Sequence, residues 1–249
     1  MWPFPDEDRL NKTVSPRKSA KGRKPSGPAF TRTKLILAAE KLFAARGIEA
    51  VSLREIAAAA GQGNNSATIY HFKNKFGVAK AIFTYRIQQM EETRLKLLAE
   101  LEERNLLGDP RALLEVMCLP QANMVDDMGR HTYAGFTAHY QYHHSPSRLG
   151  ELIQNSPALR KVHLLIYQCL SHIPREMVRL RIRTCTMMFT DFLARLDDPS
   201  VVKSVPFQAI MEDRLEMMAV ALCAPYKPKR KGGSGETVVK SIKLSIRED

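Results

Sequence analysis

The chain has 249 residues, of which 44% are hydrophobic, and a formal net charge of +12. This length fits one medium-sized domain or two smaller ones, and the hydrophobic share is sufficient for a buried core. Because there is no run of about 18 apolar residues and no apolar signal region at the N-terminus, we expect neither a membrane span nor export, and we predict a cytoplasmic protein.

Residues 1–29 are predicted to form a disordered basic arm. Their central stretch, KTVSPRKSAKGRKPSGP at 12–28, combines Pro, Gly, Ser and basic residues. A segment of this composition cannot bury enough apolar surface to become ordered by itself.

Residues 30–77 have the pattern of three short helices. The first has apolar residues at helical spacing and ends at Gly47. Ser52 and Glu55 form a capping box, in which the Ser52 hydroxyl accepts from the Glu55 amide and the Glu55 carboxylate accepts from the Ser52 amide. After a polar turn, residues 64–66 offer an N-cap to a third helix. Two short helices joined by a tight turn are typical of a helix-turn-helix.

The remainder, residues 78–225, is predicted to be almost entirely helical, and no strand pattern occurs in it. The expected helices cover about 77–104, 110–117 with an interruption at Pro120, 132–143, 157–172, and two further helices after Pro174. Residues 226–249 form a second basic tail.

The positive charge is unevenly distributed. Residues 1–29, 30–77 and 226–249 each carry 7 Lys and Arg against 3 Asp and Glu, whereas residues 78–225 carry 17 of each sign. Basic tails alone are equally consistent with a solubilising role. The same excess on the helix-turn-helix favours nucleic-acid binding, because Lys and Arg near DNA release condensed counterions.

Residues 31–77 resemble the DNA-binding domain of the tetracycline-repressor (TetR) family of transcriptional regulators. The matching residues are Ile36, Ala39, Phe43, Gly47, Ile56, Ala57, Gly61, Tyr70, Phe72 and Lys75. Three features depart from the family pattern. The interval from Gly61 to Phe72 is one residue longer, Tyr70 stands two residues before Phe72 instead of three, and Phe76 replaces the usual acid that caps the fourth helix. The resemblance implies an all-α chain, with a three-helix DNA-binding domain at 30–77 and a helical effector-binding and dimerisation domain at 78–225.

The side chains expected to contact DNA lie on the third helix, at helix starts and in the arm. Asn suits adenine edges, and Ser or Tyr suits phosphate oxygens. We predict that Asn64, Asn65, Ser66, Thr68, Tyr70 and His71 face the major groove or its phosphate walls. Phosphates would be held by Thr31, Arg32, Ser52, Arg54 and Lys75. The arm would add sequence-independent contacts through Arg17, Lys18, Lys21, Arg23 and Lys24.

Two late segments carry apolar seams with alternating spacings of four and three residues. The first comprises Val178, Ile182, Cys185, Phe189 and Phe192, and the second Met211, Leu215, Met218 and Leu222. Either seam alone also fits the core of the protein itself. The resemblance implies that the last two body helices pair with a partner chain. We therefore predict a homodimer in which both seams pack across a two-fold axis, with Arg179, Arg181 and Arg183 near Glu212, Asp213 and Glu216.

Aromatic, Met and His residues mark a candidate effector site in the body. A few polar groups in apolar surroundings are typical of small-ligand pockets, although each residue alone also fits a core or surface position. The candidates are Met117, Met124, Met128, Tyr133, Phe136, His139, Tyr140, His163 and Tyr167. Because this set lacks acidic residues, it favours an apolar or aromatic small molecule.

Motifs for catalysis or metal binding are missing. The chain has no GxSxG, no GxxxxGK[ST] and no Rossmann GxGxxG. His139 and His143 have the i, i+4 spacing of metal ligands but no HExxH context. The four cysteines lack CxxC spacing and fit reduced core positions. We therefore predict no enzyme, no cofactor and no metal.

Together these features predict a dimeric, ligand-responsive transcriptional regulator, most often a repressor by family resemblance. It would bind a double-stranded operator when free and release it on binding the effector. Two alternatives remain open at this point: an unregulated architectural DNA-binding protein, and a helical enzyme or metal-binding protein that uses the histidines.

Overall fold

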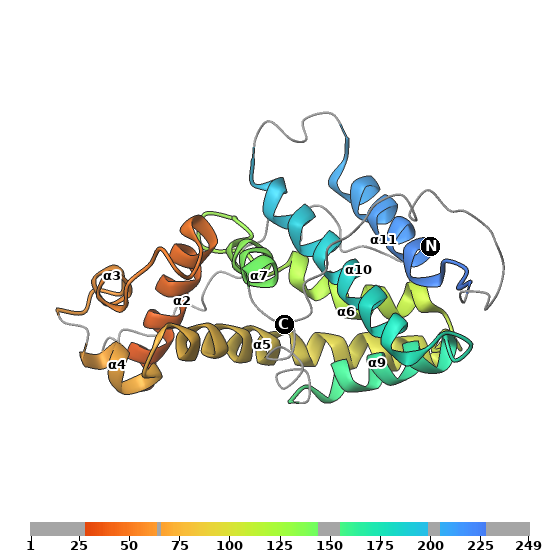
Figure 1. Ribbon diagram of the computed structural model, residues 1–249, viewed down its shortest axis with the longest axis horizontal. Helices are drawn as coiled ribbons and strands as arrows, with labels where there is room; N and C mark the ends of the chain where they lie inside the picture. Colours follow the sequence, from red (N-terminus) through yellow and green to blue (C-terminus); the bar gives the residue numbers. More distant parts are fainter. Residues whose placement is uncertain (1–27, 64–65, 144–154, 199–204, 228–249) are drawn as a thin grey trace, which may run out of the picture.

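The computed structural model of the protein describes residues 28–63, 66–143, 155–198 and 205–227. All regular secondary structure in these ranges is α-helical (Figure 1), which confirms the all-α prediction. The helices are α2 (Pro28–Arg46), α3 (Leu53–Ala59), α4 (Ser66–Phe72), α5 (Lys75–Glu103), α6 (Pro110–Ala122), α7 (Thr132–His143), α9 (Pro157–Cys169), α10 (Arg175–Leu196) and α11 (Phe207–Cys223). The basic arm, Asn64, Asn65 and the chain beyond Lys227 lie outside the described residues.

Helix α5 connects the two ends of the molecule. Its 29 residues span about 43 Å at the normal rise of an α-helix. Figure 1 shows it running from α2, α3 and α4 at one end to α6 and α9 at the other. The helix is capped by Asn74, whose side chain accepts a hydrogen bond from the Gly77 amide at 2.9 Å. The cap therefore comes from the residue before the helix, in place of the acid that Phe76 replaces.

Two helix ends differ from the sequence prediction. Helix α6 continues through Pro120 to Ala122, and α9 ends at Cys169 instead of near residue 172. A proline inside a helix removes one backbone hydrogen bond. Pro120 lies in the last turn and is buried, so its packing offsets this loss and the helix ends shortly afterwards.

A continuous core joins the N-terminal helices to the body. The ring of Phe43 on α2 lies 6.0 Å from that of Phe136 on α7, which lies 4.8 Å from that of Phe83 on α5. All three side chains belong to one buried hydrophobic cluster. Because α7 contacts both α2 and α10, direct packing connects the body to α2.

The two apolar seams face the core of the protomer, so the prediction that they form a dimer interface is wrong. Every one of Val178, Ile182, Cys185, Phe189, Phe192, Met211, Leu215, Met218 and Leu222 is at most 9% exposed in the single chain. The seam residues on α10 pack against α7 and α11, and those on α11 pack against α6 and α10. The periodicity correctly identified one face of each helix, but neighbouring helices of the same chain cover that face.

The charges beside the seams also have partners within the protomer. Arg179 pairs with Glu176 on the same helix at 2.7 Å, and Glu216 pairs with Arg111 of α6 at 3.1 Å. The Arg181 guanidinium donates to the Leu222 carbonyl at 2.9 Å. These three side chains therefore have contacts within one chain, and the arginine-to-acid contacts between chains stay a prediction.

Candidate DNA-binding site and effector domain

The capping box at the start of α3 forms as predicted. The Ser52 hydroxyl accepts from the Glu55 amide at 3.2 Å, and the Glu55 carboxylate accepts from the Ser52 amide at 2.8 Å. The Ser52 hydroxyl also donates to Glu55 at 2.8 Å. Ser52 therefore has no donor left for a phosphate in this conformation, and its side chain serves the cap.

Glu55 is held in its charged form by the same contacts. The hydrogen bond from the Ser52 amide, followed by that from the Arg46 guanidinium, lowers the pKa of Glu55 to about 2. A lowered pKa in the folded state means that the contribution of the carboxylate is present at neutral pH and is lost as the pH falls through this value. The orientation of α3 against α2 is therefore insensitive to pH in the neutral range.

Replacing Ser52 by Ala is expected to lower the free energy of unfolding by about 1 kcal/mol, because the amide of Glu55 loses its cap. Urea denaturation of the variant measures this change. Ser171→Ala, at an exposed serine after α9, is the matched control and should leave the stability unaltered. Equal stability of Ser52→Ala and the control would contradict the capping role.

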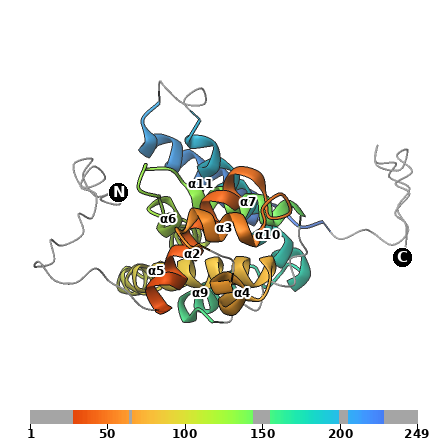
Figure 2. The same cartoon turned by 90° about the vertical axis from the view of Figure 1, so that its left-hand side faces the viewer.

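Helix α4 exposes one face at the end of the molecule. Figure 2 looks onto this end, with α3 and α4 in front of the body. Tyr70 is 83% exposed and Ile69 is 47% exposed, whereas Thr68 is fully buried. The prediction that Thr68 faces the groove is therefore wrong, since its hydroxyl lies inside the domain. His71 is half-buried, and its ring lies 5.2 Å from that of Tyr70.

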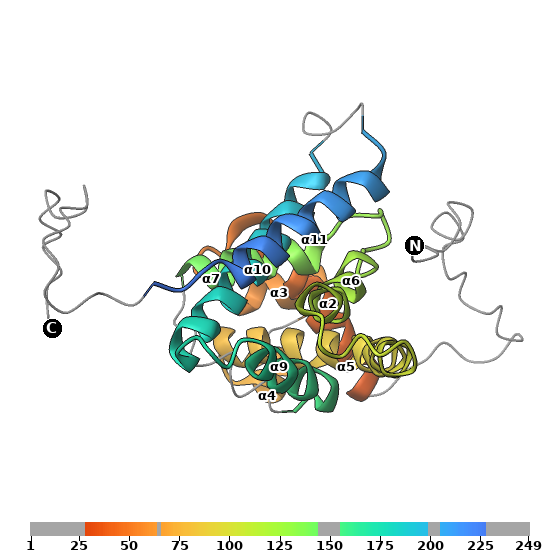
Figure 3. The same cartoon turned by 90° about the vertical axis from the view of Figure 1, so that its right-hand side faces the viewer.

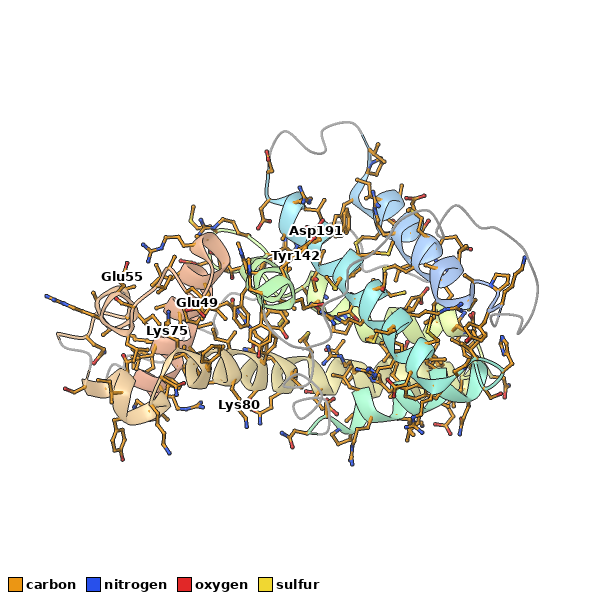
Figure 4. All side chains as sticks on the ribbon, in the orientation of Figure 1. Glu49, Glu55, Lys75, Lys80, Tyr142 and Asp191 are labelled. Carbon is orange, nitrogen blue, oxygen red and sulfur yellow. The ribbon has the colours of Figure 1, made fainter. Side chains whose placement is uncertain are left out.

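The side chains predicted to hold phosphates differ in how accessible they are to DNA. Arg32 and Arg54 are exposed, and Thr31 is half-buried. The Arg32 guanidinium lies 5.4 Å from the Phe72 ring centre, which fixes it beside α4. Lys75 instead contacts Glu49: its ammonium donates to the Glu49 carbonyl at 3.0 Å and pairs with the Glu49 carboxylate at 3.1 Å. Figure 4 shows these two side chains together, so Lys75 does not present a free charge to a phosphate.

Gly77 sets how closely α4 approaches α5. A Cβ atom at this position would lie 1.9 Å from the carbonyl oxygen of Phe72. Any larger residue would displace the backbone of α4 from the first turn of α5. The sequence marked Gly77 only as a domain boundary, because the close contact of two backbones leaves no pattern in side-chain polarity.

A buried ion pair joins α2 to α5, and sequence reasoning missed it. The guanidinium of Arg86 donates from Nε and Nη2 to the two carboxylate oxygens of Glu40, both at 2.7 Å. Thr132 of α7 donates to the same carboxylate at 2.7 Å. Glu40 is 1% exposed and Arg86 6%. The one sequence signal is the position of Glu40, which follows Ala39 on the apolar face of α2.

The residues proposed for effector binding do not form one cluster. Tyr133, Phe136 and Tyr140 lie together in the aromatic core with Phe83, and Met117 is also buried. These four remain candidates for the lining of an internal site. All of them come from α6 or α7.

The other candidates lie in different surroundings. Met128 is 74% exposed and lines a surface hollow of about 420 Å³ with His131 and Asp197, so the prediction that it lines an apolar pocket is wrong. Tyr167 is half-buried, with the Arg175 guanidinium 4.5 Å from its ring centre. The remaining three, Met124, His139 and His163, are half-buried.

Two kinds of feature do not occur in the described parts of the chain. No three His, Cys, Asp or Glu side chains gather there in a way that suits a metal ion. None of the described helices combines the length and apolar character that crossing a bilayer requires.

These helices define an all-helical protein with a helix-turn-helix at one end of a larger helical body. Residues 35–82 match the family of bacterial regulatory proteins described as the tetR family. The match covers most of α2, all of α3 and α4, and the start of α5. The chain therefore contains a helix-turn-helix domain of the kind found in bacterial regulatory proteins of the tetR family.

The chain is similar to the fatty acid degradation regulator FadR from Bacillus halodurans, with 17% sequence identity and a TM-score of 0.48. The likeness covers 79% of this chain and 97% of that one. A comparison with curated proteins finds no match.

Proposed function

We propose that the protein is a homodimeric repressor that binds an operator through α4 and releases it when a small molecule binds in the helical body. The observation that carries this proposal is the exposed face of α4 at the tip of a domain of the TetR family. Phe72 and Thr68 anchor the helix from inside, which leaves Tyr70 and Ile69 directed outward. A short helix anchored in this way suits insertion into a major groove.

The proposed DNA-binding surface combines α4 with its neighbours. Tyr70, His71 and Ser66 would contact base edges or phosphates, and Asn64 and Asn65 would extend this set from outside the described residues. Arg32, Arg54 and Thr31 would hold the flanking phosphates, and the basic arm would add contacts that do not depend on base sequence.

A dimer is proposed because two reading helices can then occupy successive major grooves. The surface that suits the contact is the outer face of α10 and α11, which lie side by side (Figure 3). This outer α10–α11 face comprises Met177, Leu180, Thr184, Met217 and Val220. Its four apolar members are between 36% and 63% exposed in the single chain.

The two helices present this face on the same side. Arg214 of α11 lies with its guanidinium 5.3 Å from the ring centre of Phe192 on α10, and Met217 stands three residues further along α11. Met217 is therefore on the flank of α11 that borders α10. Adjacent exposed apolar residues on two packed helices are typical of a protein–protein contact.

Release of DNA requires an effector that prefers the non-binding conformation, since equal affinity for both conformations shifts nothing. Helix α5 supplies a physical connection, because it begins at Lys75 beside α4 and continues into the body. The Glu40–Arg86 pair fastens α5 to α2 along the way. A ligand that moves α5 or α7 would therefore change the spacing of the two reading heads.

Replacing Tyr70 by Ala is expected to weaken binding to the operator by about 1–3 kcal/mol, if the side chain contacts the groove, without altering stability. The operator is first selected from genomic fragments with the purified protein, and affinity is then measured by fluorescence anisotropy. Tyr142→Ala is the matched control, because Tyr142 is 67% exposed and lies at the end of α7 on the side of α10 (Figure 4). Equal affinities of the two variants would contradict the role of α4.

The same assay separates a regulator from an architectural protein. A regulator selects a short palindromic site and loses affinity for it when an effector is added. An architectural protein binds all fragments alike, with a steep salt dependence and no response to small molecules.

A further inference from the structure

Arg94 is a buried charge that forms no ion pair with any of the described residues. It lies on α5 and is 2% exposed, and it is among the largest fully buried side chains of the described structure. Its Nη2 donates to the sulfur of Met90 at 3.5 Å. No acceptor within the described residues lies within reach of Nε or Nη1.

Arg86 provides an internal comparison eight residues earlier on the same helix. It is buried to a similar degree, yet its guanidinium forms two hydrogen bonds to Glu40. Buried charges are normally paired and hydrogen-bonded in this way. Arg86 contacts a carboxylate, whereas Arg94 forms a weak hydrogen bond to the sulfur of Met90.

No carboxylate within the described residues contacts the Arg94 guanidinium. Glu91 is near enough to influence the charge of Arg94, but its carboxylate already accepts from the Ala158 amide at 2.8 Å and from the Ser156 hydroxyl. Burial raises the pKa of Tyr133 to about 12 and also raises the pKa of Cys118. Both groups are therefore neutral at pH 7 and cannot balance the guanidinium.

His163 of α9 completes these surroundings. Burial lowers its pKa, so the imidazole is neutral at pH 7. Its Nδ1 lies 2.7 Å from the Leu159 carbonyl and donates to that oxygen, which makes Nε2 an acceptor. The surroundings of Arg94 thus combine neutral polar groups from α6, α7 and α9 with the side chain of Met90 and, further off, the hydrogen-bonded carboxylate of Glu91.

We propose that Arg94 binds the carboxylate of the effector, which is a small organic acid with an apolar body. This inference rests on the proposed function and names the chemical class of its ligand. Nη1 is unpaired and Nη2 contacts only the Met90 sulfur within the described residues. Together they form one fork of the planar guanidinium that matches the geometry of a carboxylate, and the resulting hydrogen bonds are charge-assisted. A single buried positive charge is balanced by one negative charge, which favours a monocarboxylate over a doubly charged phosphate.

The position of Arg94 also connects the ligand to the DNA-binding end. Tyr133 of α7 is close enough to both Arg94 and Arg86 to act on the pKa of each guanidinium. The residue before it, Thr132, donates to Glu40 of α2. An acid held by Arg94 therefore acts on the same contact between α5 and α7 that fastens α2.

The experiment compares thermal unfolding of the full-length protein and of Arg94→Met, with and without octanoate or 4-phenylbutyrate. The uncharged amides of both acids are the matched ligands. Without ligand, Arg94→Met should unfold several degrees higher than the wild type, because an unpaired buried charge has been removed. The acids should stabilise the wild type, the amides should not, and Arg94→Met should bind the acids at least about 30-fold more weakly.

Three results would overturn the proposal. They are a lower unfolding temperature of ligand-free Arg94→Met, equal effects of an acid and its amide, and no stabilisation of the wild type by either acid.

Arg94→Lys keeps the charge but lacks the planar fork, so it should retain only weak acid binding. Operator binding by both ligand-free proteins is measured in parallel, as a separate test of the proposed function. Failure of both proteins to bind any operator would contradict the proposed function, whereas the acid-binding result is decided by the unfolding data alone.

Discussion

Replacing Glu40 by Ala is expected to lower the free energy of unfolding by about 3–5 kcal/mol, since it leaves Arg86 buried without its countercharge. Burial alone lowers the pKa of Arg86, but the hydrogen bond and the charge of Glu40 outweigh it, and the pKa is raised. The carboxylate also accepts from Thr132, so the substitution removes the group on which α2, α5 and α7 converge. Urea denaturation at pH 7 measures the loss.

The control is another acid that pairs with a base. Glu92 pairs with Lys96 at 2.6 Å on the surface of α5, and Glu92→Ala should not change stability measurably, because exposed ion pairs contribute little. The double variant Glu40→Met with Arg86→Met should recover most of the lost stability, as apolar side chains of similar size replace the pair. If Glu40→Ala were as stable as the control, the pair would not form in solution.

The double variant also tests how the two ends communicate. It should remain folded and bind the operator, yet lack the polar contact that ties α2 to α5 and α7. If the Glu40–Arg86 pair carries the signal, an effector should no longer weaken operator binding by this variant. Unchanged release would assign the coupling to the aromatic contacts of Phe43 instead, which survive both substitutions.

Features that depend on nearby residues could be predicted from the sequence. The capping box uses two residues three positions apart, and Gly47 ends α2 because its φ of 76° is accessible to glycine without strain. The limits of α7 were also predicted correctly, at Thr132–His143. In each case the signal and the structure lie within one or two turns of helix.

Features that depend on distant partners could not be predicted. Glu40 and Arg86 are 46 residues apart, and Lys75 and Glu49 are 26 apart, so nothing local indicates either pair. Arg94 poses the same difficulty, because the sequence places it in a helix with charged neighbours and does not show that it points inward. Thr68 was assigned to the wrong face because a helix of seven residues gives too few turns to establish a periodicity.

The seams of α10 and α11 show a third kind of limit. Their spacing identified correctly which residues share a face. Spacing does not reveal whether a partner chain or another helix of the same chain covers that face, and here α6 and α7 cover it. The outer α10–α11 face has a weaker apolar pattern, which is interrupted by polar residues such as Thr184, and so it did not stand out.

Replacing Phe189 by Asp is therefore expected to unfold the protein. Phe189 is fully buried in the single chain, and an aspartate there would place an unpaired charge in the core, in a class of substitution that exceeds about 4 kcal/mol. Val220→Asp should behave differently, because Val220 is 63% exposed on the outer α10–α11 face. It should retain helical circular dichroism and dissociate into monomers.

Sedimentation velocity and operator binding together distinguish the two positions. The Val220→Asp monomer should lose most of its operator affinity, because one head reads half of a two-fold site. Leu164→Asp is the matched control, since Leu164 is 56% exposed but lies on α9, and this variant should remain a dimer. A Val220→Asp protein that stays dimeric would move the proposed interface to another surface. A folded monomer of Phe189→Asp would instead mean that the apolar seam of α10 contributes to the contact between chains. Helix α10 would then separate from the core when the dimer dissociates.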